Sequence, residues 1–134
     1  MILLVACAHV NSFFMAQALA LKIFKKLVRE ATDFMTSSPP EVPFLLMVNF
    51  LHVHTPLFSA PEFRGKSNHG KYGDNVLELD WAVGQIMDQL ERLGVKNDTI
   101  VYFSTDQAAH IEEVSQGTHV RTILKAIQKT IIFF

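Results

Sequence analysis

Apolar positions recur with a helical period in the segment from residue 16 to residue 34. They lie three or four residues apart, as one face of a helix requires: Leu19, Ile23, Leu27, Ala31 and Phe34. This helix must end near Pro39 and Pro40, because consecutive prolines remove backbone donors and disfavour helical geometry in the residue before them.

A second helix is predicted over residues 75–93. Asp74 is a suitable N-cap and Gly94 a suitable C-terminal stop. We expect Glu78, Asp88 and Glu91 to lie mostly on the solvent side. The expected apolar face comprises Val76, Leu79, Val83, Ile86, Met87, Leu90 and Leu93.

Two short apolar segments flank this second helix. Residues 43–51 do not alternate with polar residues, which favours a strand that is covered on both faces of a parallel sheet. Residues 99–105 are rich in β-branched and aromatic side chains and predict a second buried strand. Strand, long helix and strand form a βαβ unit with parallel strands and a right-handed crossover. The predicted fold class is therefore α/β.

The first 24 residues are largely apolar, but several polar residues interrupt them. A transmembrane helix needs about 20 mostly apolar residues, and no basic residue precedes the apolar run as in a signal peptide. We favour a buried or partly disordered helix at this end, with membrane association as the alternative. The chain then divides into an apolar segment at 1–26, a central domain at 27–115 and a divergent tail at 116–134.

Composition restricts the possible partners and compartments. The 134 residues are 49% hydrophobic, enough for one core, and the net charge of −1 gives no reason to expect a nucleic-acid partner. The single cysteine, Cys7, cannot form an internal disulfide. Asn97, followed by Asp98 and Thr99, fits the N-glycosylation pattern at a predicted turn.

Polar side chains follow both predicted strands, at the sheet edge where α/β proteins bind ligands. Asp106 and Gln107 offer adjacent oxygen ligands of the type that calcium prefers, although an Asp after a strand is also a common helix N-cap. His52 and His54 would point to the same side of an extended segment. Either could donate a proton or hold an anion, or could simply be a hydrogen-bonded residue at a strand end.

Four segments of the chain resemble the sulfatase family, of the arylsulfatase and steryl-sulfatase type. They are residues 43–58, 65–76, 78–86 and 101–115, in that order. With a weaker helical match before them, they extend the resemblance over about residues 27–115. The resemblance implies an alkaline-phosphatase-like α/β fold and calcium-dependent hydrolysis of sulfate esters. It assigns contact with sulfate to His54 and calcium binding to Asp106 and Gln107. His52 is only a second-rank candidate for a site residue.

The chain also departs from the family pattern. Relatives convert the cysteine of a Cys-x-Pro-x-Arg motif to a formylglycine nucleophile, and Cys7 does not lie in such a motif. The N-terminal acidic calcium ligands and a later lysine that binds sulfate are missing, and Ala108 replaces a glycine. We therefore expect a partial sulfatase chain that is inactive in isolation.

The resemblance and the pattern at Asn97 imply the secretory pathway, either the endoplasmic reticulum membrane or the lysosome. The alternative function is a non-catalytic chain that associates with membranes or with a protein partner. A further alternative is a sequence without a folded product.

Overall fold

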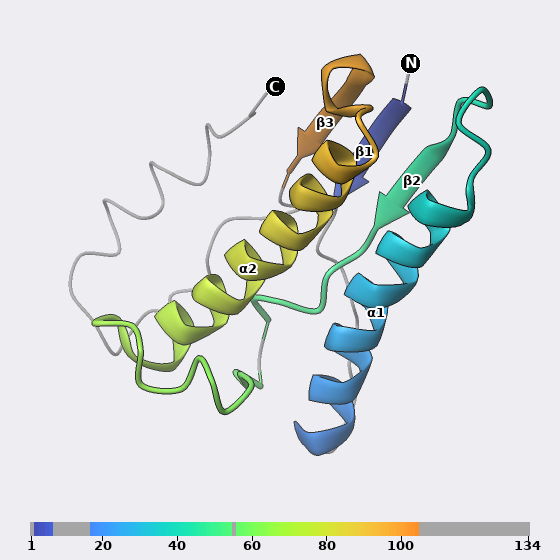
Figure 1. Cartoon of the computed structure of the whole chain (residues 1–134). Coiled ribbons are helices and arrows are strands. Elements are labelled where there is room, and N and C mark those ends of the chain that lie inside the picture. The colour runs from blue at the N-terminus through green and yellow to red at the C-terminus, as the bar shows by residue number, and fades with distance from the viewer. Residues whose placement is uncertain (1, 7–16, 55, 105–134) are drawn as a thin grey trace.

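The computed structural model of the chain describes residues 2–6, 17–54 and 56–104. It confirms the α/β class, with strands and helices in one layer each (Figure 1). In chain order the elements are β1 (Ile2–Ala6), α1 (Gln17–Ser37), β2 (Leu45–Val48), α2 (Gly70–Arg92), the 3₁₀ helix η1 (Lys96–Asp98) and β3 (Thr99–Phe103).

The three strands form one parallel sheet with the order β2-β1-β3. Leu3 pairs in register with Leu45 of β2 on one side and with Ile100 of β3 on the other. Strands β2 and β3 are thus parallel, as predicted, but they are not neighbours. The expectation of a helix throughout residues 1–24 is wrong, because Ile2–Ala6 form the central strand. The partners of this strand are distant in sequence, so no local pattern reveals the pairing.

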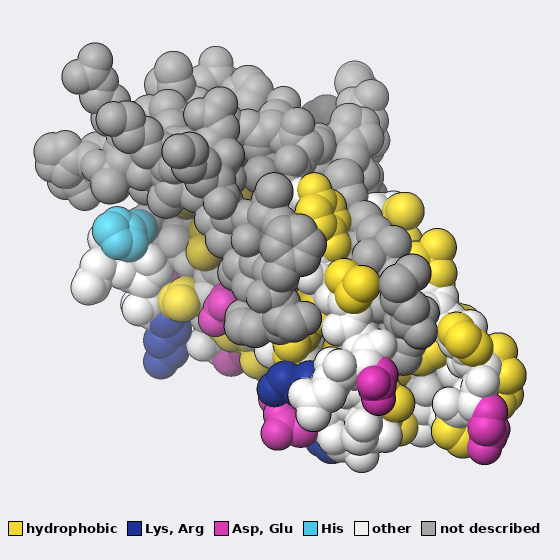
Figure 2. All heavy atoms as spheres, turned by 90° about the horizontal axis from the view of Figure 1, so that it is seen from above, with side chains coloured by type: hydrophobic (Ala, Val, Ile, Leu, Met, Phe, Trp, Pro, Cys, Tyr) yellow, Lys and Arg dark blue, Asp and Glu magenta, His cyan; other side chains and the backbone are white. Residues whose placement is uncertain are grey.

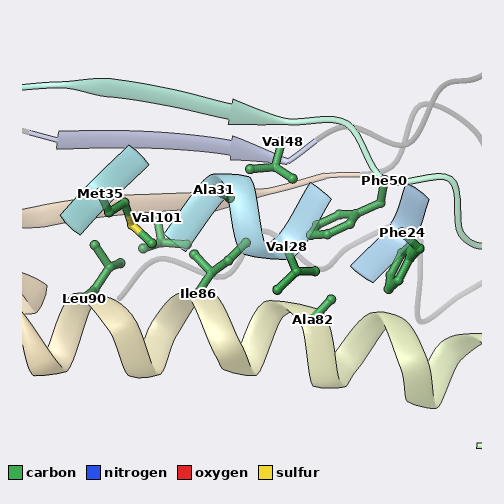
Figure 3. Packing of buried hydrophobic residues seen from close by; sticks show 10 residues of the cluster. All are labelled: Phe24, Val28, Ala31, Met35, Val48, Phe50, Ala82, Ile86, Leu90 and Val101. Atoms are coloured by element: carbon green, nitrogen blue, oxygen red, sulfur yellow. The ribbon is translucent and has the colours of Figure 1, made fainter. Parts of the chain in front are cut away.

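Both helices cover the same face of the sheet (Figure 1). The core lies between the sheet and the helices, as Figure 3 shows for ten of its side chains. Helix α1 contributes Phe24, Val28, Ala31 and Met35, helix α2 contributes Ala82, Ile86 and Leu90, and the sheet side contributes Val48, Phe50 and Val101.

The opposite face of the sheet carries exposed apolar side chains. Leu45 is 61% exposed, Met47 57% and Ile100 39%, whereas Val48 and Val101 point into the core. The prediction that the first strand is covered on both faces is therefore wrong for β2. In the space-filling view, too, hydrophobic side chains remain exposed on the visible face (Figure 2).

Helix α1 ends at Ser37, before the two prolines, as predicted. Its buried stripe differs from the predicted one, because Phe24, Val28 and Met35 are buried while Phe34 is 43% exposed. The helix has apolar residues over a wide arc, and packing against the sheet decides which of them are buried. Within the described parts of the chain, no helix is sufficiently long and apolar to cross a membrane.

Helix α2 begins at Gly70, earlier than predicted, and Asp74 is not its N-cap. The C-terminal stop at Gly94 is confirmed. Gly94 has a φ of 70°, its N–H donates to Glu91 O at 2.9 Å, and the Val95 N–H donates to Leu90 O at 3.1 Å. This is a Schellman motif, which glycine favours because it accepts positive φ without strain.

Candidate functional site

The site lies at the edge of the sheet where the three parallel strands end. The chain leaves β2 at this edge and passes through residues 49–69 before it enters α2 (Figure 1). His54, the predicted sulfate contact, belongs to this loop and is an exposed residue. It therefore follows β2 on the side of the sheet where the parallel strands end.

His52 is buried, with 1% of its surface exposed. Its ring stacks on Phe24 at a centroid distance of 4.1 Å, and the ring of Phe58 meets it edge-on at 4.9 Å. The expectation that both histidines face the same side is wrong, because β2 ends at Val48 and a turn follows at His52. The first histidine is thus a hydrogen-bonded core residue, and the second is the one exposed at the edge.

The hydrogen-bond partner of His52 is Glu78, which is fully buried. Glu78 Oε2 lies 3.0 Å from His52 Nε2 and accepts the Ala60 backbone N–H at 2.9 Å. The other oxygen, Oε1, has no hydrogen-bond partner within the described parts of the chain. In the tautomer that carries the proton on Nε2, His52 donates this hydrogen bond to Glu78 Oε2.

The prediction that Glu78 faces solvent is wrong, and two residues of the predicted apolar face, Val76 and Leu93, are instead 40% and 36% exposed. Glu78 precedes the buried residues Ala82 and Ile86 by one and two steps of four, which places it on their helix face. This spacing was the signal available in the sequence. Glutamate is rarely fully buried without a partner, and the partner is distant in sequence.

One helical turn before Glu78, Asp74 holds the next part of the loop. Its carboxylate accepts backbone N–H groups from Gly65 at 2.8 Å, Lys66 at 3.1 Å and Ser67 at 2.9 Å. Asp74 therefore organises the loop rather than capping the helix. The buried Gly73 permits close contact here, because a Cβ atom on it would lie only 1.9 Å from Ser67 Oγ.

Several charged side chains surround the loop. Lys25 of α1 forms an ion pair with Glu62, and this hydrogen bond holds the pKa of the exposed Glu62 carboxyl below its ordinary value. Arg64 Nε donates to Ser59 O at 2.8 Å, while Lys66 is exposed.

The predicted calcium ligands Asp106 and Gln107 lie outside the described residues. Within residues 2–6, 17–54 and 56–104, no group of three or more His, Cys, Asp and Glu side chains could hold a metal ion. The buried carboxylate of Asp74 is engaged by backbone donors. Asn97, the predicted glycosylation position, is exposed in η1.

The chain belongs to the sulfatase family. The Sulfatase family model matches residues 23–130, most of the chain. This match extends at both ends beyond the segment from 27 to 115 that carries the resemblance in the sequence.

The relatives include animal and bacterial sulfatases. The chain is 54% identical over 91 residues to steryl-sulfatase from Homo sapiens, which covers 68% of the chain and 15% of that protein. It is 47% identical over 91 residues to human arylsulfatase H, covering 68% of the chain and 16% of the relative. It therefore spans less than one fifth of the length of these relatives.

Solved structures show the same fold. A structure from Bacteroides thetaiotaomicron, described with the metabolism of multiple glycosaminoglycans, has a TM-score of 0.60 and 33% identity, covering 72% of this chain and 19% of the other. A second structure, Ps i-CgsB in complex with a neocarrahexaose, has a TM-score of 0.61 at 24% identity, covering 72% of this chain and 22% of the other. The chain thus has part of the alkaline-phosphatase-like α/β fold of sulfatases.

Proposed function

We propose that the chain carries one part of a sulfate-ester site, with His54 as its anion contact, and that in isolation it binds sulfate esters without turnover. The observation that carries this proposal is the position of the exposed residue His54 in the loop after β2, at the carboxyl edge of the parallel sheet of a sulfatase-family chain. A histidine there can donate a hydrogen bond to a sulfate oxygen or a proton to the departing alcohol. The ligand class is aryl or steryl sulfate esters.

The proposal includes calcium as the cation of the site. Asp106 and Gln107 follow β3, whose carboxyl end lies at the same edge as that of β2. Their carboxylate and amide oxygens are ligands of the kind calcium takes. When bound, calcium would supply positive charge beside the sulfate oxygens. Calcium takes about 6–8 oxygen ligands, so affinity from these two residues alone is expected to be weak.

The absence of turnover is proposed from the cysteine content. Cys7 is the only cysteine among the 134 residues, and it stands between Ala6 and Ala8 rather than in a Cys-x-Pro-x-Arg motif. Without the formylglycine that this motif yields in relatives, the chain has no nucleophile to attack sulfur. We place the chain in the secretory pathway on the basis of its relatives and of the pattern at Asn97.

The experiment compares binding and hydrolysis of a generic aryl sulfate by the purified chain in the presence of calcium. The variants are His54→Ala and, as matched control, His69→Ala, which removes another exposed imidazole from the same loop. We expect saturable binding that His54→Ala weakens and His69→Ala preserves, with no aryl alcohol released. Failure of the unmodified chain to bind would refute the site, and hydrolysis that disappears in His54→Ala would refute the claim of no turnover.

A second candidate function is association with a protein partner. It is favoured by the exposed apolar face of the sheet, represented by Leu45, Met47 and Ile100. Parallel sheets are normally covered on both faces, and the chain spans 15% of human steryl-sulfatase, so the occupant we expect is a covering layer of further sulfatase polypeptide. Sedimentation of the chain and of Met47→Lys tests this function, because a charge on this face should weaken any association.

A further inference from the structure

Two carboxylates on α2 organise the loop between β2 and α2. Asp74 and Glu78 are four residues apart, and therefore lie on one face of the helix. Asp74 accepts three backbone N–H groups from residues 65–67, whereas Glu78 contacts an earlier part of the loop. Each carboxylate thus holds a different segment.

Glu78 joins the two ends of the segment that contains His54. The same atom, Glu78 Oε2, lies 3.0 Å from His52 Nε2 and 2.9 Å from the Ala60 backbone nitrogen. One buried oxygen therefore links His52 to Ala60, on either side of His54 in the sequence. His54 stands two residues after one of these anchor points.

Aromatic rings enclose the His52 end of this link. Phe24 stacks on the His52 ring with an interplanar angle of 17°, and Phe58 packs against it at 78°. With the ring held between these two side chains and its Nε2 directed at Glu78, the backbone next to His54 has little freedom.

We propose that Glu78 is a positioning residue, which holds the imidazole of His54 at the sheet edge by closing residues 52–60 through His52 and Ala60. This inference rests on the proposed function of His54 as the sulfate contact. Glu78 is fully buried, so its effect reaches His54 through the loop. For reacting groups a misplacement of about 1 Å can cost about a hundredfold in rate, and we expect a smaller but measurable loss for a binding contact.

Asp74→Asn is the matched control for Glu78→Gln. Asp74 is 5% exposed, lies on the same helix and holds neighbouring backbone, but not the segment that contains His54. If both carboxylates were merely structural, Glu78→Gln and Asp74→Asn would affect sulfate binding by His54 to the same extent. If Glu78 positions His54, only Glu78→Gln should affect it.

The test uses the full chain with labelled histidines and inorganic sulfate as the probe, followed by the NMR signals of the His54 ring. His54→Asn assigns these signals. We expect Glu78→Gln to weaken the sulfate affinity at least about tenfold and Asp74→Asn to change it less than about twofold. Equal effects of the two variants, or no effect of Glu78→Gln, would overturn the proposal.

Amide hydrogen exchange separates this proposal from the function on which it rests. Without sulfate, Glu78→Gln should speed amide exchange at residues 53, 54 and 57–59 at least about tenfold, and Asp74→Asn should act on residues 65–67 instead. If the unmodified chain shows no sulfate response, the proposed function fails while exchange still decides the role of Glu78. If Glu78→Gln does not fold, His52→Phe, which breaks the closure from its other end, is compared with Asp74→Asn by the same two measurements.

Discussion

The buried pair of His52 and Glu78 predicts that the effect of His52→Phe on stability changes sign. This substitution should destabilise the unmodified chain but stabilise the Glu78→Leu variant. Glu78→Leu removes the acceptor and leaves two buried donors, the His52 ring N–H and the Ala60 N–H, without a partner. Each unsatisfied buried donor costs about 1–3 kcal/mol, so we expect the free energy of unfolding to fall by about 2–6 kcal/mol. The total is a large part of the stability of a small domain, which is about 5–15 kcal/mol.

His52→Phe perturbs the pair from the other side. The phenyl ring can keep the packing between Phe24 and Phe58, which is aromatic on both sides, but the carboxylate of Glu78 then stays buried with a single donor. Leaving a buried carboxyl group without one of its hydrogen-bond partners costs about 1–3 kcal/mol. If the two changes acted independently, the double variant would lose about 3–9 kcal/mol, the sum of the two ranges.

The double variant of His52→Phe and Glu78→Leu should instead be more stable than Glu78→Leu alone. Both members of the pair are then apolar, and only the Ala60 N–H is unsatisfied, at a cost of about 1–3 kcal/mol. Urea unfolding followed by fluorescence of Trp81, the only tryptophan, measures all four proteins in one cycle. Additive losses in the double variant would refute the assignment of a coupled, buried hydrogen-bonded pair.

Three further predictions concern packing and charge. Gly73→Ala should destabilise the chain by about 1–3 kcal/mol, because its Cβ would overlap Ser67. Gly84→Ala has open space around it and should stabilise the chain by up to about 1 kcal/mol. Urea unfolding of both variants tests the two opposite signs. Ile86→Ala should cost about 2–5 kcal/mol, because Ile86 is 1% exposed in the core, and thermal unfolding that is unchanged would contradict this. The hydrogen bond from Lys25 lowers the pKa of Glu62 below 4.5. The stability that this pair contributes is therefore present above pH 4.5 and is lost as the pH falls through the lowered pKa. In Lys25→Met, NMR titration should show the pKa of Glu62 returning toward 4.5.

The sequence predicts the boundaries of the described helices best at their C-terminal ends. The end of α1 before Pro39 and the stop of α2 at Gly94 are confirmed, because each depends on the backbone chemistry of one or two residues. The buried face of α1 was predicted one position away from the observed one at Ile23 and Leu27, since Phe24 and Val28 are buried in their place. Both stripes are apolar, and only the surface of the sheet distinguishes them.

Strand β1 could not be predicted for a different reason. Its residues, Ile2–Ala6, belong to a longer apolar stretch, in which a helix and a strand have the same composition. Their assignment depends on pairing with β2 and β3, which begin about forty and about one hundred residues later. A contact of this range leaves no trace in local periodicity.

The two histidines show why the candidate site was only partly predictable. Had the strand continued past Val48, the period of two would have placed His52 and His54 on one side, and the sequence offered no reason to separate them. The turn at His52 directs one imidazole into the core and leaves the other exposed, so the choice between a structural and a functional histidine is made by where the strand ends. What fixes the inward ring is Glu78, a residue whose charge argues against burial and whose helical spacing argues for it. In this chain the spacing was the better guide, because a partner for the charge was available in the same loop.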